Sequence, residues 1–253
     1  MRLRAVAVGL AAAVVVSAST LAAAAFAGSA HRQAAPRLTV FAAASLTDVF
    51  PRIDPHGRYS FGGSNMLAAQ IQQGLPADVF ASANTKLPYQ LHKQGLVTTP
   101  YVFTSNRLVI VVAQGNPLHL AGVRDLERPG LRIVMAAAGV PVGDYTRTVL
   151  GRLGLSDLVG KAVSQETDVR EVLAKVLLGE ADAGFVYATD AKTVAGKVSL
   201  LRLPPSSQPR VAYAAAAVKS SKHLAAAKAW VKALRGKAAQ QKLRAAGFLP
   251  IPH

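Results

Sequence analysis

The chain has 253 residues, of which 51% are hydrophobic, so it can bury a full core, and a disordered chain is excluded. It contains no cysteine, which excludes disulfides, thiolate metal sites, cysteine nucleophiles and a lipid-modified N-terminal cysteine. Its net charge is +16, and residues 1–36 hold three arginines and no acid, so +13 belongs to the rest. Such a charge suits a nucleic acid, an anionic cell surface or an anionic solute.

Residues 1–27 are predicted to be a signal peptide. They begin with Arg2 and Arg4, continue as a nearly uncharged apolar stretch, and reach Ala25-Phe26-Ala27, a small-x-small peptidase site. The alternative is a retained membrane anchor, since this stretch is long enough to span a bilayer. In both cases residues 38 onward face the outside, after a linker over 28–37.

From Arg37 the hydrophobic pattern alternates between strands and helices. Strands are predicted at residues 38–44, 58–61, 77–83, 107–113, 131–137, 181–188, 198–204 and 211–219. Helices are predicted at residues 46–53, 65–74, 85–94, 139–153 and 168–178, with two more at the C-terminal end. This alternation predicts an α/β fold with parallel or mixed sheets covered by helices.

The motifs of common enzymes are missing. The six histidines never pair at the spacing of metal ligands, and no HExxH, GxSxG or phosphate-loop sequence is present. The acids Asp48, Asp144 and Asp168 stand near predicted helix starts, where the helix dipole already accounts for them. The basic residues of 219–244 recur among alanines as a solvated helix face would. We therefore expect neither an enzyme nor a nucleic-acid-binding protein.

The stretch VFAAASLTDVF, residues 40–50, ends an apolar run in the hydroxyl of Ser45. Ser45 with Asp48 three residues later has the form of a capping box, which is one interpretation. The other is an anion site, because the N–H groups at a helix start attract negative charge.

Strands that run into helices through small residues recur at Ala44-Ser45, Gly63-Ser64 and Val142-Gly143. In open α/β sheets ligands bind beyond the carboxyl ends of strands, where helix starts converge. None of the three junctions supplies a compulsory Lys or Arg. A pocket built from neutral donors suits a fully deprotonated oxyanion, which offers no proton of its own.

Several segments resemble the molybdate-binding proteins of ABC importers, in the right order and over nearly the whole mature chain. The matching segments are TVFAAASLTD at 39–48, GSNMLAAQI at 63–71, GLPADVFASAN at 74–84, VPVGDYT at 140–146, the long segment at 167–191, and the terminal AAGFLP.

The resemblance implies a two-lobed periplasmic-binding-protein-like clamshell of type II. One lobe would comprise residues 38–107 plus 211–253 and the other residues 108–210, with a hinge of two chain crossings. It implies a monomer that binds molybdate, and tungstate with it, for a membrane ABC permease, without a cofactor and without direct metal ligands. Hydroxyl donors would be Ser45, Ser64 and Tyr187, and backbone N–H donors would be Val142 and Val169.

The sequence departs from the family at three places, one of which is MAAAG at 135–139, which lacks the acidic turn often found before the VP. Ser45 and Ser64 are only 19 positions apart (64 minus 45), and Pro51 and Pro55 fall between them, so the first helix must be short. Val142 stands where the family commonly has Ala, which keeps the backbone donor. A binding protein for sulfate, phosphate or an organic acid is the alternative within the same class, and an exported enzyme or surface-adhesion module is the alternative outside it.

Overall fold

Short apolar runs build two five-stranded sheets in the computed structural model, which describes residues 36–251. The first sheet has the order β2-β1-β3-β10-β4. Its strands are β1 (Thr39–Ala43), β2 (Arg58–Gly62), β3 (Val79–Ser82), β4 (Tyr101–Asn106) and β10 (Val211–Ala217). Strand β1 is parallel to β2 and β3, whereas β10 is antiparallel to β3 and β4.

The second sheet repeats this plan with the order β7-β6-β8-β5-β9. Its strands are β5 (Leu108–Ala113), β6 (Ile133–Ala136), β7 (Ala162–Glu166), β8 (Ala183–Tyr187) and β9 (Val198–Arg202). Strand β6 is parallel to β7 and β8, and β5 is antiparallel to β8 and β9. The chain therefore passes between the sheets twice, after β4 and before β10. We call the part on the first sheet lobe 1 and the part on the second sheet lobe 2.

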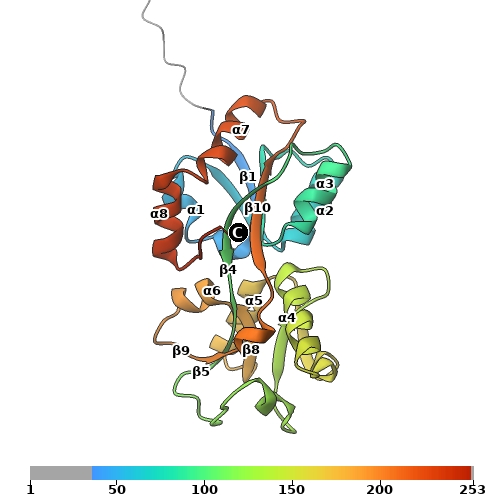
Figure 1. Cartoon of the computed structure of the whole chain (residues 1–253), viewed down its shortest axis with the longest axis vertical. Coiled ribbons are helices and arrows are strands. Elements are labelled where there is room, and N and C mark those ends of the chain that lie inside the picture. Colours follow the sequence, from blue (N-terminus) through green and yellow to red (C-terminus); the bar gives the residue numbers. More distant parts are fainter. Residues whose placement is uncertain (1–35, 252–253) are drawn as a thin grey trace, which may run out of the picture. The chain divides into compact units, whose positions relative to one another are not determined.

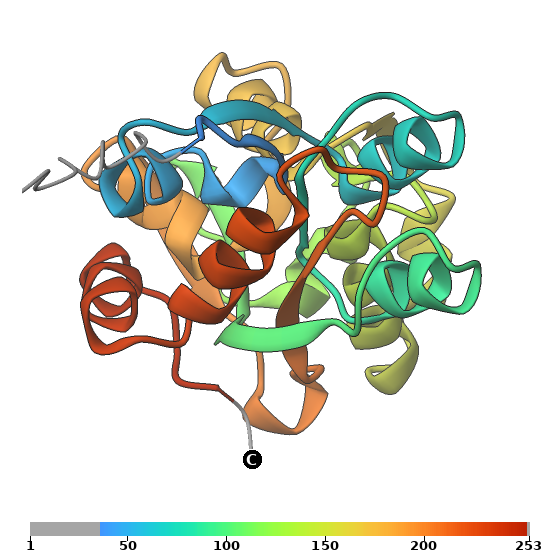
Figure 2. The same ribbon diagram turned by 90° about the horizontal axis from the view of Figure 1, so that it is seen from above.

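Helices cover both sheets, as expected for an α/β fold (Figure 1). Lobe 1 carries α1 (Phe50–Ile53), α2 (Ser64–Gln72), α3 (Lys86–Lys93), α7 (Leu224–Ala233) and α8 (Lys237–Ala246). Lobe 2 carries α4 (Pro141–Arg152), α5 (Val169–Leu177) and α6 (Ala188–Thr193). Figure 2 shows the C-terminal helices, in red, on one side of the first sheet and α2 and α3 on the other.

Several helix ends follow the predicted signals. Gly74, Gly95 and Gly179 adopt φ values of 84°, 79° and 72°, the left-handed backbone that lets a glycine end a helix. The Asp168 side chain accepts hydrogen bonds from the N–H groups of Arg170 and Glu171, so it caps α5 as one of two residues predicted for that place. These signals are local, which explains why they can be found in the sequence.

A series of aromatic contacts runs from the core of lobe 1 to Tyr187, at the end of β8 in lobe 2. Phe50 packs against Trp230 at a centroid distance of 5.3 Å and against Phe103 at 6.0 Å. Phe103 contacts Tyr213 at 6.2 Å, and Tyr213 contacts Tyr187 of lobe 2 at 5.8 Å. The Trp230 indole also donates a hydrogen bond of 2.9 Å to Asp54, which fixes α7 to the turn after α1.

Some predicted elements need correction. The helix predicted at 46–53 is a 3₁₀ turn (Ala44–Leu46) followed by the four residues of α1, because Pro51 can stand only in the first turn of a helix. The sequence pattern also omitted β4, β7 and α6. Strand β7 alternates between half-buried and exposed positions, so it lacks the apolar run that marks a buried strand.

The signal peptide prediction, and with it the choice between cleavage and anchoring, lies outside the described residues. Within residues 36–251, none of the helices is both long and apolar enough to cross a membrane.

Candidate functional site

In lobe 1 the carboxyl ends of the parallel strands present two serines. Strand β1 runs directly into the 3₁₀ turn that contains Ser45, and β2 runs through Gly63 into α2, whose first residue is Ser64. Because β1 and β2 are parallel neighbours, these ends lie at the same edge of the sheet. Both serines are buried, with exposed fractions of 3% and 1%.

In lobe 2 the same arrangement presents two helix starts and a tyrosine. Strand β6 leads to α4, where Pro141 and Val142 are the first two residues, and β7 leads to α5, where Val169 is the first. Tyr187 is the last residue of β8, next to β6 in the sheet. These ends also share one edge, since β6, β7 and β8 are parallel.

The structure brings all five predicted site residues to one cavity. Its walls come from both lobes: Ala43, Ala44, Ser45, Gly62, Gly63, Ser64 and Ala83 from lobe 1, and Val140, Pro141, Val142, Asp168, Val169 and Tyr187 from lobe 2. The cavity volume open to the centre of a water molecule is about 10 Å³. This is roughly the space of one water, so a larger guest can enter only when the lobes move apart.

The Ser45 hydroxyl does not cap a helix, contrary to the capping-box interpretation. No side chain caps the 3₁₀ turn, and Ser45 Oγ is instead hydrogen-bonded to Tyr213 Oη at 2.9 Å. Asp48 is likewise used elsewhere, in an ion pair with Arg170. The hydroxyl of Ser64 accepts a hydrogen bond of 3.1 Å from the N–H of Ala83. Its proton is therefore left to donate to another group, which leaves a free O–H in the cavity wall.

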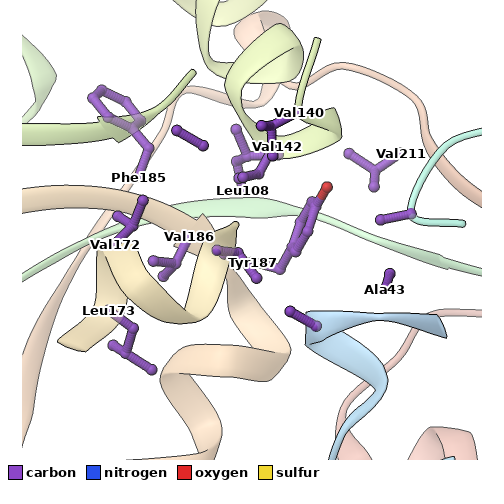
Figure 3. Close-up of a cluster of buried hydrophobic side chains, with 14 of the residues drawn as sticks. Ala43, Leu108, Val140, Val142, Val172, Leu173, Phe185, Val186, Tyr187 and Val211 are labelled. Carbon is purple, nitrogen blue, oxygen red and sulfur yellow. The ribbon is translucent and has the colours of Figure 1, made fainter. Parts of the chain in front are cut away.

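The Tyr187 hydroxyl is buried without a partner. The residue is 1% exposed, and its Oη is one of three buried side-chain oxygens or nitrogens in residues 36–251 that make no hydrogen bond. Burial, with a smaller contribution from the neighbouring Tyr213 hydroxyl, raises the pKa of this hydroxyl well above its ordinary value, so it is held as a proton donor. The Tyr213 hydroxyl does not lie in hydrogen-bonding geometry with it. Figure 3 shows the Tyr187 ring among apolar side chains that include Val142, Val211 and Ala43. An unpaired buried hydroxyl costs free energy, and such a group is typical of a ligand site.

Two backbone donors complete the wall. Val142 and Val169 stand in the first turn of their helices, where N–H groups have no intrahelical acceptor. The Asp168 cap takes the N–H groups of Arg170 and Glu171 and not that of Val169. Both helix starts also add the positive end of a dipole to the cavity.

Two glycines allow backbone segments around the cavity to pack closely. A Cβ on Gly143 would lie 2.2 Å from the carbonyl oxygen of Ala137, so only glycine lets the first turn of α4 pack against the end of β6. A Cβ on Gly63 would lie 2.3 Å from the carbonyl oxygen of Thr167 in the other lobe. Gly63 therefore sets how closely the lobes approach.

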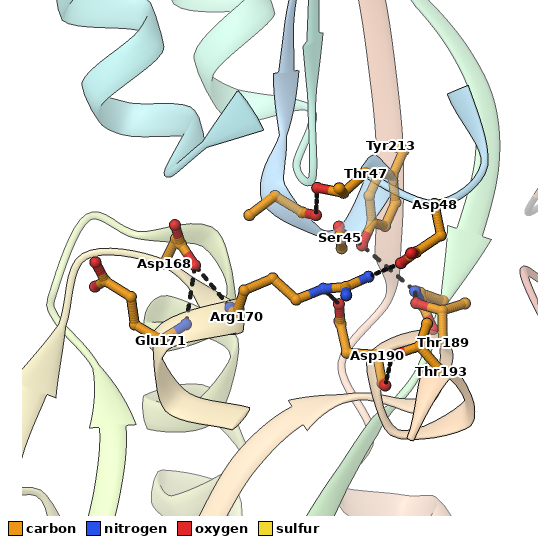
Figure 4. A network of polar contacts seen from close by, with 12 residues as sticks. Ser45, Thr47, Asp48, Asp168, Arg170, Glu171, Thr189, Asp190, Thr193 and Tyr213 are labelled. Atoms are coloured by element: carbon orange, nitrogen blue, oxygen red, sulfur yellow. Dashed lines mark hydrogen bonds and ion pairs between the residues drawn. The ribbon is translucent and has the colours of Figure 1, made fainter. Parts of the chain in front are cut away.

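Of the lysines and arginines in residues 36–251, none lines the cavity, although the protein is strongly basic. Among the described wall residues, Asp168 is the only one with a carboxyl group, and its pKa is raised by burial and lowered in part by the N–H groups of α5. The nearby Arg170 is engaged by two carboxylates, Asp190 in lobe 2 and Asp48 in lobe 1 (Figure 4). The residues of 36–251 contain no cluster of three or more His, Asp or Glu that could hold a metal ion. The groups in the cavity wall can therefore bind an anion by donating hydrogen bonds to it.

Three residues around the site were not predicted: Tyr213, Asp168 as a wall residue, and Arg170. Tyr213 is 168 positions from Ser45, and β10 brings it there by entering the first sheet after the chain returns from lobe 2. It lies in an apolar stretch, VAYAAAA, where a tyrosine gives no sign that its hydroxyl is used. Asp168 and Arg170 directly flank Val169 in the sequence, and these two charges beside a predicted site residue were the available signal.

Comparisons with known proteins agree with this geometry. The family model described as bacterial extracellular solute-binding protein matches residues 38–249. The chain is 38% identical to the molybdate-binding protein ModA of Mycobacterium tuberculosis over 226 residues, which cover 85% of each chain. It is 32% identical to ModA of Escherichia coli over 228 residues, covering 84% of this chain and 88% of that one.

Solved structures show the same fold. The periplasmic molybdate-binding protein of Azotobacter vinelandii superposes with a TM-score of 0.75 at 25% identity, over 86% of this chain and 100% of that one. The sulfate-binding protein SubI of Mycobacterium tuberculosis superposes with a TM-score of 0.72 at 20% identity, over 85% and 87% of the two chains, and this likeness concerns the fold alone.

Proposed function

Because the chain belongs to the family of bacterial extracellular solute-binding proteins, we propose that it captures molybdate outside the cytoplasmic membrane and delivers it to an ABC permease. The observation that carries this proposal is the cavity between the lobes, where two serines, a tyrosine and two helix starts present uncharged donors. The relatives named for molybdate binding cover most of the chain, which supports the choice of ion.

Each donor has a defined role. The Ser64 and Tyr187 hydroxyls point free protons at the ion, and the Ser45 hydroxyl donates to it while accepting from Tyr213. The N–H groups of Val142 and Val169 bind further oxygens. A hydrogen bond to a charged group is worth about 1.5–3 kcal/mol, so five donors together can offset the desolvation of a small dianion.

Uncharged donors also explain selectivity. Molybdate near neutral pH is a dianion without a proton, so each of its oxygens accepts. Phosphate carries a proton at that pH and is best bound where a carboxylate can accept it, and the one carboxylate among the wall residues, Asp168, already caps α5. Sulfate has the right charge but is smaller, so donors placed for molybdate would be stretched on it. Tungstate matches molybdate in shape and charge, and we expect it to bind as well.

Closure of the lobes completes the cavity. Each lobe supplies only part of the donor set, so an ion held by one lobe gains the remaining donors when the other lobe rotates onto it about the two chain passages. The closed protein, acting as a monomer, then presents both lobes together to the permease.

Thermal unfolding with a panel of anions tests the proposal. A ligand at 100 times its Kd adds about 2.7 kcal/mol of stability, which for a chain of this size raises Tm by roughly 5–10 °C. We expect this rise with molybdate and tungstate, and its loss in a Ser45→Ala, Ser64→Ala double variant. An equal rise with sulfate or phosphate would contradict the proposal and favour a binding protein for that anion.

A further inference from the structure

The side chain of Arg170 connects three segments that each carry part of the ion site. Its Nε donates to Asp190 Oδ1 at 2.6 Å, and its terminal nitrogen pairs with Asp48 Oδ2 (Figure 4). Asp48 follows the 3₁₀ turn that holds Ser45, and Asp190 belongs to α6, which begins directly after Tyr187. Arg170 itself follows Val169 in the first turn of α5.

The two carboxylates have different surroundings. Asp190 is fully buried and lies in the same lobe as Arg170, so this ion pair fixes the guanidinium within lobe 2. Asp48 belongs to lobe 1, and its side chain is 43% exposed while that of Arg170 is 27% exposed. Within residues 36–251, the Asp48 side chain makes no other hydrogen bond or ion pair. Its one contact therefore exists only while the lobes are together.

We propose that Arg170 is a positioning residue for ion capture, whose ion pair with Asp48 holds the lobes closed over the bound ion and slows its release. This inference rests on the proposed function. Asp190 orients the guanidinium beforehand, so little side-chain freedom is lost when Asp48 arrives. The two carboxylates also neutralise the charge of Arg170. The ion in the cavity is therefore bound by uncharged donors, without a free cation beside it.

The sharpest test replaces Asp48, the partner of Arg170 in lobe 1. Asp190 is less suitable because it is buried, and its replacement would leave the charge of Arg170 without its partner inside lobe 2. In stopped-flow measurements with molybdate, Asp48→Asn should release the ion about tenfold faster, with a nearly unchanged association rate, since encounter precedes closure. Asp48→Glu keeps the charge and should recover part of the slow release. A role limited to stability would not separate the two rates in this way.

Asp182→Asn is the matched control. It breaks the Arg132–Asp182 ion pair of 2.7 Å, whose two members both belong to lobe 2. It should lower Tm and leave the release of molybdate unchanged. Equal release from the wild type and Asp48→Asn would overturn the inference while leaving the proposed function intact.

A distance measurement tests the closure contact without any ligand. The chain has no cysteine, so Gln73→Cys in lobe 1 and Lys161→Cys in lobe 2, both exposed, can carry a pair of spin labels. In the ion-free protein, Asp48→Asn should shift the distance distribution toward longer separations, and Asp182→Asn should not. If the wild type fails to bind molybdate, the proposed function falls, and this measurement still decides whether Asp48 and Arg170 hold the lobes together.

Discussion

The hydroxyl of Tyr187 gives the site its most specific signature, because a buried donor without a partner in the ion-free protein is ready for an acceptor. We expect Tyr187→Phe to weaken molybdate binding by roughly tenfold or more, the loss of one charge-assisted hydrogen bond. The same change should leave the Tm of the ion-free protein unchanged or raise it, since it removes an unsatisfied group. Calorimetry and thermal unfolding measure the two effects.

Tyr59→Phe is the control for the effects of Tyr187→Phe on molybdate affinity and on the Tm of the ion-free protein. The Tyr59 hydroxyl donates to the Asp54 carbonyl at 2.6 Å, away from the cavity. Its removal should lower Tm and leave molybdate affinity unchanged. If Tyr187→Phe instead destabilised the ion-free protein and bound molybdate normally, its hydroxyl would be a structural group.

Asp190 gives a pH dependence of stability whose sign follows from its burial. Burial raises the pKa of its carboxyl to about 6, against the lowering effect of Arg170. The folded state then binds the proton more tightly than the unfolded chain, so this contribution to stability is complete below about pH 4 and is lost as pH rises through about 6. Relative to Asp190→Asn, the wild type should lose stability between those values. A difference in unfolding free energy that is constant or rises with pH would contradict this.

At the scale of elements, Gly63 controls the meeting of the lobes. Gly63 has φ −59° and ψ 128°, which alanine can adopt. Within lobe 1 the added Cβ would meet only the end of the Asn65 side chain, at 2.9 Å, which can move away, so Gly63→Ala should not destabilise the separated lobes. Its Cβ would nevertheless lie 2.3 Å from the Thr167 carbonyl oxygen, so closure must stop short. We expect roughly tenfold weaker molybdate binding without a lower Tm in the ion-free protein.

Gly160→Ala is the control, because Gly160 lies outside the cavity wall with φ −74° and ψ −16°, and its Cβ would lie 3.6 Å from the Asp157 carbonyl oxygen. Calorimetry on both variants checks the prediction. Equal affinities for Gly63→Ala and the wild type would show that the lobes need not approach as closely as the structure has them.

The elements also show what the sequence can and cannot predict. The parallel strands and the helix ends at Gly74 and Gly179 are signalled locally, by apolar runs and by glycines that tolerate positive φ. The five site residues follow from strand-to-helix junctions and from family resemblance. Tyr213, by contrast, reaches Ser45 only through the return of β10 into the first sheet, a pairing of residues 168 positions apart that no local pattern records.

At the scale of the molecule, charge is divided unequally between the lobes. Residues 38–107 and 211–253 contain 13 Lys and Arg against three acids, whereas residues 108–210 contain 12 against ten. The eight basic residues after position 210 are all exposed. The protein therefore attracts a dianion over a distance, although no lysine or arginine of the described part of the chain lines the cavity.

This arrangement predicts a salt effect on association. The rate constant for molybdate binding should fall about two- to tenfold when ionic strength rises from about 0.01 M to about 0.15 M, because screening weakens the long-range attraction. The dissociation rate should change much less, since the contacts in the cavity are short and buried. Stopped-flow measurement at several salt concentrations gives the association and dissociation rates separately. An association rate that does not change with salt would show that the net charge plays no part in capture.

A crystal structure of the protein with molybdate tests the central claim most directly. We predict the ion in the cavity between the lobes, with its oxygens about 2.7–3.2 Å from Ser45 Oγ, Ser64 Oγ, Tyr187 Oη and the backbone nitrogens of Val142 and Val169. We also predict no lysine or arginine in contact with it. An ion bound elsewhere, or held in the cavity by a cationic side chain, would contradict the account.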